Sequence, residues 1–277
     1  MAKIGEINKL RVKRTRDYGA HLDGGESGDI LLPGREMPRG CQPGDEVEVF
    51  IYVDREDRIR ATRHKPLAMV RQFAALKVVA NTASGAYLDW GLPLDLMVPK
   101  SEQLERMTVG KIYAVFVFLD RETGRITGST KLEKFLGRKP PQYEEGAEVE
   151  LLIYALTDLG YKAVVDRSHV GMLYKNEVFR ALAPGISLKG YIKKIRADGK
   201  IDLSLQPSGY RGIDELAQTI LDTVKGRGGR LALSDKSPPE EIHALFGVSK
   251  KTFKTALGAL YKKRLIILEA DGIRLVR

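Results

Sequence analysis

The chain has 277 residues, of which 43% are hydrophobic and 30% are charged, and this composition excludes a chain that is disordered throughout. Its formal net charge of +10 favours polyanionic partners, either nucleic acid or an acidic membrane surface. The single cysteine excludes an internal disulfide and a cysteine metal cluster.

No segment has the properties of a signal peptide or of a membrane helix. The first residues, MAKIGEINKLRVKRTR, contain no long apolar run. The longest wholly apolar stretch covers residues 112–119, whereas a membrane helix needs about 20 residues. We therefore expect a soluble protein of the reducing cytoplasm, with no membrane partner.

The first three quarters of the chain contain a threefold internal repeat. Two sets of glycines keep the same offset between copies, and a set of basic residues keeps it to within one position. These anchors are Gly19, Gly85 and Gly160; Gly44, Gly110 and Gly185; and Arg58, Arg125 and Lys200. A constant offset across three copies indicates duplication of one folding unit.

Each copy has the pattern of a small β-barrel. Residues 46–53 begin by alternating polar and apolar side chains, as a half-buried strand does. The segments DRED, DRETG and RADG supply turn residues between the last two strands of the three copies. A unit of this size with five short strands is typical of a closed Greek-key barrel of the OB type.

After residue 212 the hydrophobic period becomes helical. Apolar residues at 213, 216, 217, 220, 221 and 224 predict one helix, which the glycines from 226 to 229 end. Ser237, with Glu240 three residues later, and Ser249 are expected to cap two shorter helices. Residues 265–276 then predict two short strands around a turn. Two helices joined by a tight turn and followed by such a hairpin predict a winged helix-turn-helix.

The predicted fold class is mostly β with a C-terminal α+β domain: three tandem OB-fold barrels followed by a winged helix-turn-helix. The predicted domain boundaries are 1–65, 66–138 and 139–207 for the three barrels, and 208–277 for the winged helix. The linkers between these domains are short, so we expect modules with separate cores.

Barrels of this kind bind single strands through aromatic platforms, with cations nearby for the phosphates. The candidate contact residues of the first two barrels are Tyr18, His21, Arg58, Tyr87, Trp90 and Arg125. The third barrel offers Tyr174 and Lys200, but Leu159 and Lys162 stand where the first has Tyr18 and His21. Strand tyrosines are often packing residues, and Trp90 could instead plug the end of its barrel.

The second helix of the predicted helix-turn-helix is rich in lysine. Its candidate contacts are Lys250, Lys251, Lys254, Lys262, Lys263 and Arg264. No pattern in the chain indicates catalysis, because the four histidines are scattered and the carboxylates mostly lie in predicted turns. We predict that the protein is not an enzyme and has no catalytic residues, no metal site and no cofactor.

The segments DYGAHL, PGDEVEV and GKIDLSL resemble parts of the S1 RNA-binding domain, the OB-fold repeat of a ribosomal protein. Three such repeats followed by a winged helix resemble the conserved virulence factor B family of bacterial proteins over essentially the whole chain. The resemblance implies RNA binding and a role in the post-transcriptional control of gene expression.

The leading hypothesis is an RNA-binding regulator whose barrels and winged helix share one single strand of RNA. A first alternative is a DNA-binding transcription regulator with the lysine-rich helix in a major groove. That helix offers few of the Asn, Gln or Arg side chains that read bases, and its lysines suit phosphate contacts. A second alternative is a protein-binding adaptor of a ribosome or RNA-decay assembly, whose protein partners the sequence does not identify.

Overall fold

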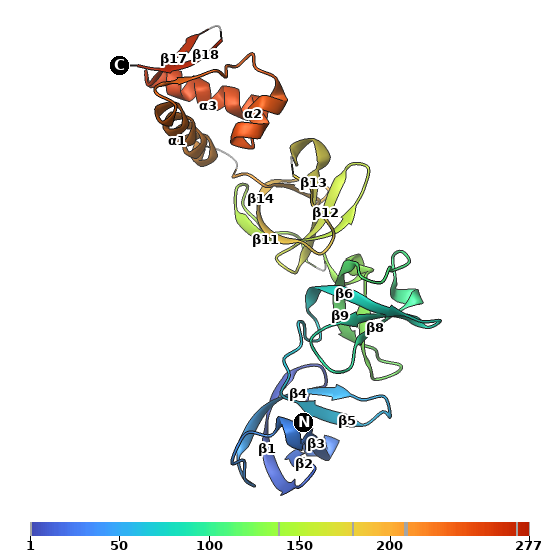
Figure 1. Cartoon of the computed structure of the whole chain (residues 1–277). Helices are drawn as coiled ribbons and strands as arrows, with labels where there is room; N and C mark the ends of the chain where they lie inside the picture. Colours follow the sequence, from blue (N-terminus) through green and yellow to red (C-terminus); the bar gives the residue numbers. More distant parts are fainter. Residues whose placement is uncertain (1, 138, 179, 208–209, 270, 277) are drawn as a thin grey trace. The chain divides into compact units, whose positions relative to one another are not determined.

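The computed structural model describes residues 2–137, 139–178, 180–207, 210–269 and 271–276. Within them the chain forms three five-stranded barrels followed by a helical domain with a small sheet (Figure 1). The predicted fold class is therefore confirmed. The chain divides into two compact units, one of residues 1–136 and 184–186 and the other of residues 137–183 and 187–277.

The first barrel closes in the strand order β1-β2-β3-β5-β4. Its strands are β1 (Ile7–Arg16), β2 (Gly19–Asp23), β3 (Asp29–Pro33), β4 (Glu46–Val53) and β5 (Ile59–Thr62). Two short 3-10 helices, η1 (Gly25–Ser27) and η2 (Gly34–Glu36), flank the third strand. The closed sheet leaves no exposed edge for pairing with another chain.

The second and third barrels repeat this plan. The second contains β6 (Phe73–Asn81), β7 (Gly85–Asp89), β8 (Leu96–Pro99), β9 (Ile112–Leu119) and β10 (Ile126–Ser129), with η3 (Lys100–Glu102) and η4 (Leu132–Phe135). The third contains β11 (Glu148–Leu156), β12 (Gly160–Val165), β13 (His169–Tyr174), β14 (Ser187–Ile195) and β15 (Ile201–Ser204), with η5 (Lys175–Glu177). In all three barrels the third strand pairs in parallel with the fifth.

An identical irregularity in the first strand of each barrel supports the repeat. The register shifts between Val12 and Arg14, between Val78 and Ala80, and between Ile153 and Ala155. These positions keep the same offsets as the repeated glycines. Such bulges bend a strand and increase its twist, which helps a short strand to curve around a barrel.

The first glycine set is required by a close approach of two backbones at the start of the second strand. A Cβ atom on Gly19 would lie 2.2 Å from the carbonyl oxygen of Leu32. At Gly160 the corresponding distance, to the carbonyl oxygen of Leu173, is 2.1 Å. No side chain fits at these distances, so the barrel can close only if this position is glycine.

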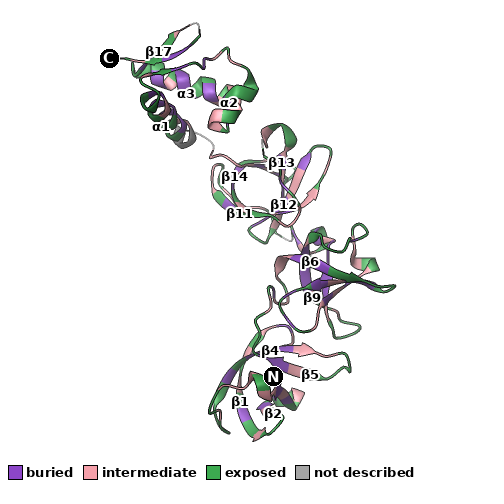
Figure 2. Cartoon of the chain, in the orientation of Figure 1, coloured by how far each residue is buried: buried purple, intermediate pink, exposed green. Residues whose placement is uncertain are grey.

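Each barrel has its own hydrophobic core, built from the inward-facing residues of its strands (Figure 2). In the first barrel Leu22, Ile30, Leu32 and Ile51 are fully buried. The residues between them along the strands are more exposed, as the twofold period of a strand requires. Each predicted domain boundary falls between the last strand of one barrel and the first strand or helix of the next domain. We therefore propose that these boundaries separate the four domains.

Phe50 is an exception to this separation of cores. It lies on β4 of the first barrel, yet it packs in the core of the second barrel, where its ring contacts Trp90 edge-to-face at 5.7 Å between centroids. The backbone N–H of Val70 also donates to the carbonyl of Gly5 at 2.9 Å. The first two barrels therefore share a packed junction within their unit.

The C-terminal domain has three helices and a three-stranded sheet in the order β16-β18-β17. Its elements are α1 (Tyr210–Gly226), β16 (Arg230–Leu231), α2 (Pro239–Phe246), α3 (Lys250–Lys262), β17 (Ile266–Glu269) and β18 (Gly272–Leu275). One core joins all three helices, with Phe253 of α3 and Ile220 of α1 completely buried. The helix α1 ends at Gly226, as its glycines predicted.

Only one of the two predicted serine caps forms. The Ser249 hydroxyl accepts a hydrogen bond from the backbone N–H of Thr252 and caps α3. Ser237 does not cap α2, because the N-cap position is Pro238 and no side chain caps it. The Ser237 hydroxyl instead accepts from the N–H of Ser234 and closes the preceding turn.

We expect Ser249→Ala to lower the stability of the winged helix by about 1 kcal/mol, because the first turn of α3 loses its side-chain acceptor. Ser249→Asp is the matched control, since aspartate caps a helix about as well as serine. Thermal unfolding followed by circular dichroism measures both. Equal loss in the two variants would contradict a capping role.

We expect Phe50→Ala to lower the free energy of unfolding by about 3–5 kcal/mol, because it opens a cavity in the junction core. Trp90 is the only tryptophan and reports on this site directly. Its emission should shift to longer wavelength as water reaches the ring. Phe50→Leu should show smaller changes in both measurements, and an unchanged emission maximum in Phe50→Ala would contradict the packed junction.

Candidate nucleic-acid interface

The strand register places four side chains of each barrel next to one another on the side of the strands that faces away from the barrel core, and we call this set the outer row; Thr127 of the second barrel is nevertheless buried. In the first barrel the row is Arg14, His21, Leu31 and Arg60, from β1, β2, β3 and β5 in that order. The neighbour Ala20 is fully buried, so the alternation along β2 turns His21 outward. The row joins residues that lie far apart in the sequence.

The same register defines the outer rows of the other two barrels. The second barrel contributes Ala80, Tyr87, Met97 and Thr127. The third contributes Ala155, Lys162, Met172 and Asp202. The first row is therefore cationic, the second is uncharged with one tyrosine ring, and the third contains both signs of charge.

In the first barrel two predicted residues form an aromatic pair. Tyr18 lies directly before β2 with 61% of its surface exposed. Its hydroxyl is 3.1 Å from Nε2 of His21, and the two rings meet edge-to-face at 5.8 Å between centroids. An exposed ring held in place by a neighbour is a suitable platform for a nucleic-acid base.

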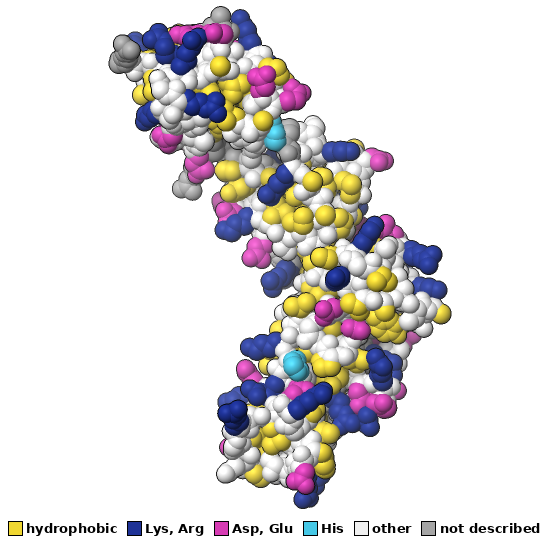
Figure 3. All heavy atoms as spheres, in the orientation of Figure 1, with side chains coloured by type: hydrophobic (Ala, Val, Ile, Leu, Met, Phe, Trp, Pro, Cys, Tyr) yellow, Lys and Arg dark blue, Asp and Glu magenta, His cyan; other side chains and the backbone are white. Residues whose placement is uncertain are grey.

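Two arginines, Arg14 and Arg60, lie at the two ends of the row that contains His21, and Figure 3 shows Lys and Arg side chains next to hydrophobic surface on the first barrel. The predicted Arg58 lies one residue before β5 and donates to Asp54 and Glu56. Arg60, in the outer row, donates to the same Asp54 at 2.9 Å. Burial would raise the pKa of Asp54, but hydrogen bonds from the backbone of Arg58 and from both guanidinium groups hold it well below its usual range. This carboxylate therefore stays ionised and holds two cations beside the row.

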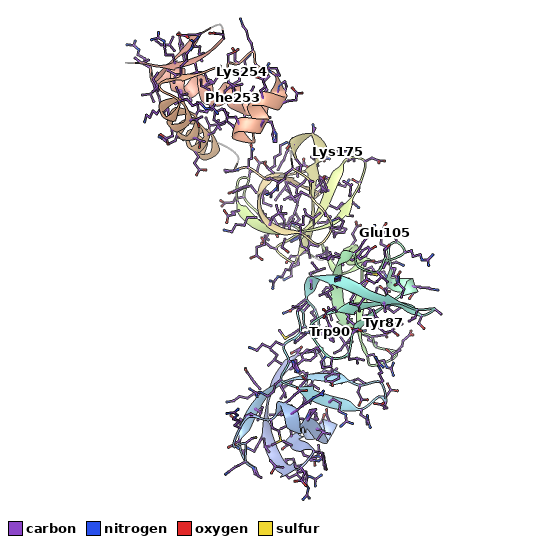
Figure 4. All side chains as sticks on the ribbon, viewed as in Figure 1. Tyr87, Trp90, Glu105, Lys175, Phe253 and Lys254 are labelled. Carbon is purple, nitrogen blue, oxygen red and sulfur yellow. The ribbon has the colours of Figure 1, made fainter. Side chains whose placement is uncertain are left out.

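In the second barrel the two predicted aromatic residues have different roles (Figure 4). Tyr87 is half-buried in the outer row and lines a groove of about 710 Å³. Trp90 is only 3% exposed, and its Nε1 donates to the carbonyl of Leu94 at 2.5 Å. Because the ring of Trp90 is enclosed in the junction with Phe50, a base cannot stack on it. We therefore correct the prediction that Trp90 is a platform.

The predicted phosphate contact Arg125 is engaged across the junction of the first two barrels. Its Nε and Nη2 atoms donate to Oδ1 of Asp57 at 3.0 and 2.7 Å. Both side chains remain about half exposed or more. An exposed pair of this kind contributes little to stability, so a phosphate can compete with Asp57 for the guanidinium.

In the third barrel the predicted aromatic residue already has a cation beside it. The Tyr174 hydroxyl donates to Asp202 at 3.2 Å and also accepts from Arg196, whose guanidinium carbon lies 5.8 Å from the ring centroid. The predicted Lys200 pairs with Asp198 at 2.8 Å. This barrel thus offers a weaker platform than the first.

The candidate cations of the C-terminal domain lie on α3 or directly after it. Lys254 points away from the core while its neighbour Phe253 points into it (Figure 4). Some of these cations have acceptors: Lys250 donates to the Lys236 carbonyl, Lys254 pairs with Asp235, and Lys263 pairs with Asp214. Among the described residues, Lys251, Lys262 and Arg264 form no ion pair.

Sequence reasoning missed residues of these surfaces, among them Arg14 and Arg60 of the first outer row and Tyr261 of α3. Arg60 lies two positions after Arg58, and the alternation of the strand could have identified it as the outward residue. Tyr261 is 58% exposed on α3, two helical turns after Lys254 and on the same face. An aromatic residue between exposed lysines was the available signal.

Within the described part of the chain, no cluster of His, Cys, Asp and Glu side chains could hold a metal ion. The described helices also include none that is long and apolar enough to cross a membrane.

Comparisons with known domains agree with this architecture. A family model of the S1 domain matches residues 4–64 and 72–131, which cover the first two barrels. A family model described as the CvfB-like winged helix domain matches residues 218–275. The third barrel lies outside the S1 match, and its outer row is also the one without an aromatic ring.

Similar proteins extend over nearly the whole chain. The uncharacterized protein YitL of Bacillus subtilis is 29% identical over 274 residues, which cover 96% of this chain and 91% of that protein. Conserved virulence factor B of Staphylococcus saprophyticus is 28% identical, with 99% of this chain and 95% of that protein covered. The crystal structure of a multidomain protein with nucleic acid binding domains from Streptococcus pneumoniae TIGR4 is 24% identical, with a TM-score of 0.46 and with 99% and 98% of the two chains covered. The chain therefore contains S1 domains and a CvfB-like winged helix domain, and over nearly its full length it is similar to proteins named conserved virulence factor B.

Proposed function

We propose that this protein is a regulator that binds single-stranded RNA and acts in the post-transcriptional control of gene expression. S1 domains point to nucleic-acid binding, and S1 domains and winged helices are typically not enzymes. The observation that carries the proposal is the exposed pair of Tyr18 and His21 with Arg14 and Arg60 in the same outer row. A ring for a base and cations for the phosphates are the two parts that single-strand binding needs.

The three barrels contribute unequally in this proposal. The first provides an open platform, the second provides Tyr87 inside a groove, and the third has a tyrosine that Arg196 already covers. Unpaired bases can stack on such rings without a fixed sequence, whereas the stacked bases of a duplex cannot. This arrangement therefore favours a single strand over a duplex.

The winged helix adds a second cationic surface to the same strand. Its exposed face carries Lys251, Lys254, Lys262 and Tyr261. Lysines attract phosphates as point charges and carry little sequence information. Linked weak sites on one strand can raise affinity by about 10²–10⁴ without any new contact.

The main alternative is specific binding of duplex DNA through α3. A recognition helix of that kind normally presents Arg, Asn or Gln to the base edges. From Lys250 to Lys262 the helix contains none of these three residue types. The second alternative, a protein-binding adaptor, predicts nucleic-acid affinity too weak to persist at physiological salt.

The test is a titration of the whole protein with single-stranded RNA, single-stranded DNA and duplex DNA at low and at physiological salt. The proposal predicts the tightest binding to single-stranded RNA at both concentrations. Preference for duplex DNA would favour the transcription regulator. Complete loss of all binding at physiological salt would favour the adaptor.

We expect Tyr18→Ala combined with Tyr87→Ala to weaken RNA binding by about tenfold or more, because stacking on one ring contributes about 1–3 kcal/mol. The double variant with phenylalanine at both positions is the matched control, since it keeps both rings. Fluorescence anisotropy with a labelled RNA measures the affinities. Unchanged affinity in the alanine variant would contradict the assignment of these platforms.

We expect Lys251→Gln to make RNA binding less sensitive to salt. The slope of log affinity against log salt should shrink by about 0.7, the value for one lost phosphate contact to a single strand. Lys111→Gln, on an exposed turn of the second barrel, removes the same charge away from α3. A slope that changes equally in both variants would show only the effect of net charge.

A further inference from the structure

The groove that contains Tyr87 has two walls from different barrels. Tyr87 and Met97 of the outer row lie on the second barrel, and Tyr52 and Arg55 lie at the end of β4 and in the turn that follows it in the first barrel. The junction formed by Phe50 and Trp90 keeps these walls together. The groove is thus the outer row of the second barrel, enclosed by its neighbour.

The size and lining of the groove suit a flat aromatic ligand. Its volume of about 710 Å³ falls in the range of about 300–1,000 Å³ that is usual for small-ligand sites. Tyr87 supplies an aromatic face and Met97 a polarisable thioether beside it. A single base turned out of an RNA strand is the ligand that this combination would hold.

The charges of the groove favour a base over a phosphate. Its lining includes the carboxylates of Asp54, Asp95 and Asp120, which would repel a phosphate group. Arg55 and Arg125 also line it and can hold the backbone of the strand outside. A base that enters this groove must therefore present hydrogen-bond donors to an acceptor-rich lining.

Asp95 is the acceptor that the protein itself leaves available. Asp54 is occupied by Arg58 and Arg60, and Asp120 accepts from the backbone of its own turn. Among the described residues, no hydrogen bond or ion pair engages the half-buried Asp95 carboxylate. Burial raises the pKa of Asp95, the neighbouring Asp89 raises it further, and Arg55 opposes both. A partly desolvated acceptor without a partner in the protein gains from a ligand that donates to it.

Guanine matches a carboxylate better than the other bases do. Its Watson–Crick edge offers two adjacent donors, N1–H and the N2 amino group, which can meet both carboxylate oxygens at once. Adenine, cytosine and uracil place a ring nitrogen or carbonyl acceptor next to their donor, and that acceptor would face the second carboxylate oxygen. A bidentate pair of this kind discriminates between bases by about tenfold or more in nucleic-acid recognition.

We propose that the groove between the first two barrels binds one guanine base, which stacks on Tyr87 and donates from N1 and N2 to the Asp95 carboxylate. This inference rests on the proposed RNA-binding function and adds a base preference to it. Asp95 is then the residue that determines specificity, while Tyr87 contributes affinity for any base.

The experiment uses the full chain and short uridine oligonucleotides that carry one central guanosine, inosine, adenosine or cytidine. The wild-type protein should bind the guanosine probe about tenfold more tightly than the others. Inosine, which lacks the N2 amino group, should lose a large part of this preference. The comparison of guanosine with inosine needs no variant and so does not depend on the folding of a mutant.

Asp95→Asn should reduce the guanosine preference to about twofold or less, because the amide presents a donor where the second carboxylate oxygen was. Glu105→Gln is the matched control, since it removes a negative charge from an exposed site of the same barrel outside this groove (Figure 4). It should keep the preference. Tyr87→Ala should weaken all four probes by similar factors.

The outcomes separate this inference from the proposed function. If none of the probes binds in a salt-dependent way, the RNA-binding proposal itself fails. If all bind but guanosine has no advantage, or if Asp95→Asn strengthens every probe equally, the groove does not read guanine while RNA binding stands. Loss of the guanosine preference in Asp95→Asn alone supports the assignment.

Discussion

The parallel pairing of the third and fifth strands is the contact on which each barrel depends. It closes a sheet whose short strands would otherwise leave exposed edges. It also places Arg60, Thr127 and Asp202 beside the third strand of their barrels, although each lies about 30 positions further along the chain than its partner. The outer rows exist only because this pairing forms. The repeated glycines at the start of the second strand serve the same closure, because any side chain there would collide with a backbone carbonyl.

Three copies of one backbone carry three different surfaces. The bulge, the strand order and the outward positions are the same, while the side chains in the outer rows change from cationic to uncharged to mixed in charge. A surface that tolerates substitution in this way can specialise without loss of the fold, because its residues do not build the core. In the proposed function the first barrel is an open platform and the second a groove, while in the third the guanidinium of Arg196 lies over the tyrosine.

The junction between the first two barrels changes what the second barrel can do. Phe50 leaves the core of its own barrel and packs with Trp90, and this contact turns an aromatic residue of binding type into a structural one. The same junction brings the β4–β5 turn of the first barrel to the wall of the groove around Tyr87. A groove of this kind belongs to the pair of barrels, so neither repeat alone would contain it.

The sequence alone determined the threefold repeat, the barrel type and the winged helix. These follow from local rules: the period of apolar residues, the turn residues, and glycines at constant offsets. The sequence could not predict the surroundings of Trp90, Arg125 or Asp95. The residues that surround them belong to another barrel or to a distant loop. The prediction that Ser237 caps α2 was wrong. Pro238 occupies the N-cap position, and the Ser237 hydroxyl accepts a hydrogen bond in the preceding turn instead. Strand alternation is a property of consecutive residues, whereas burial at a junction depends on which surfaces meet, and only the tertiary structure decides that.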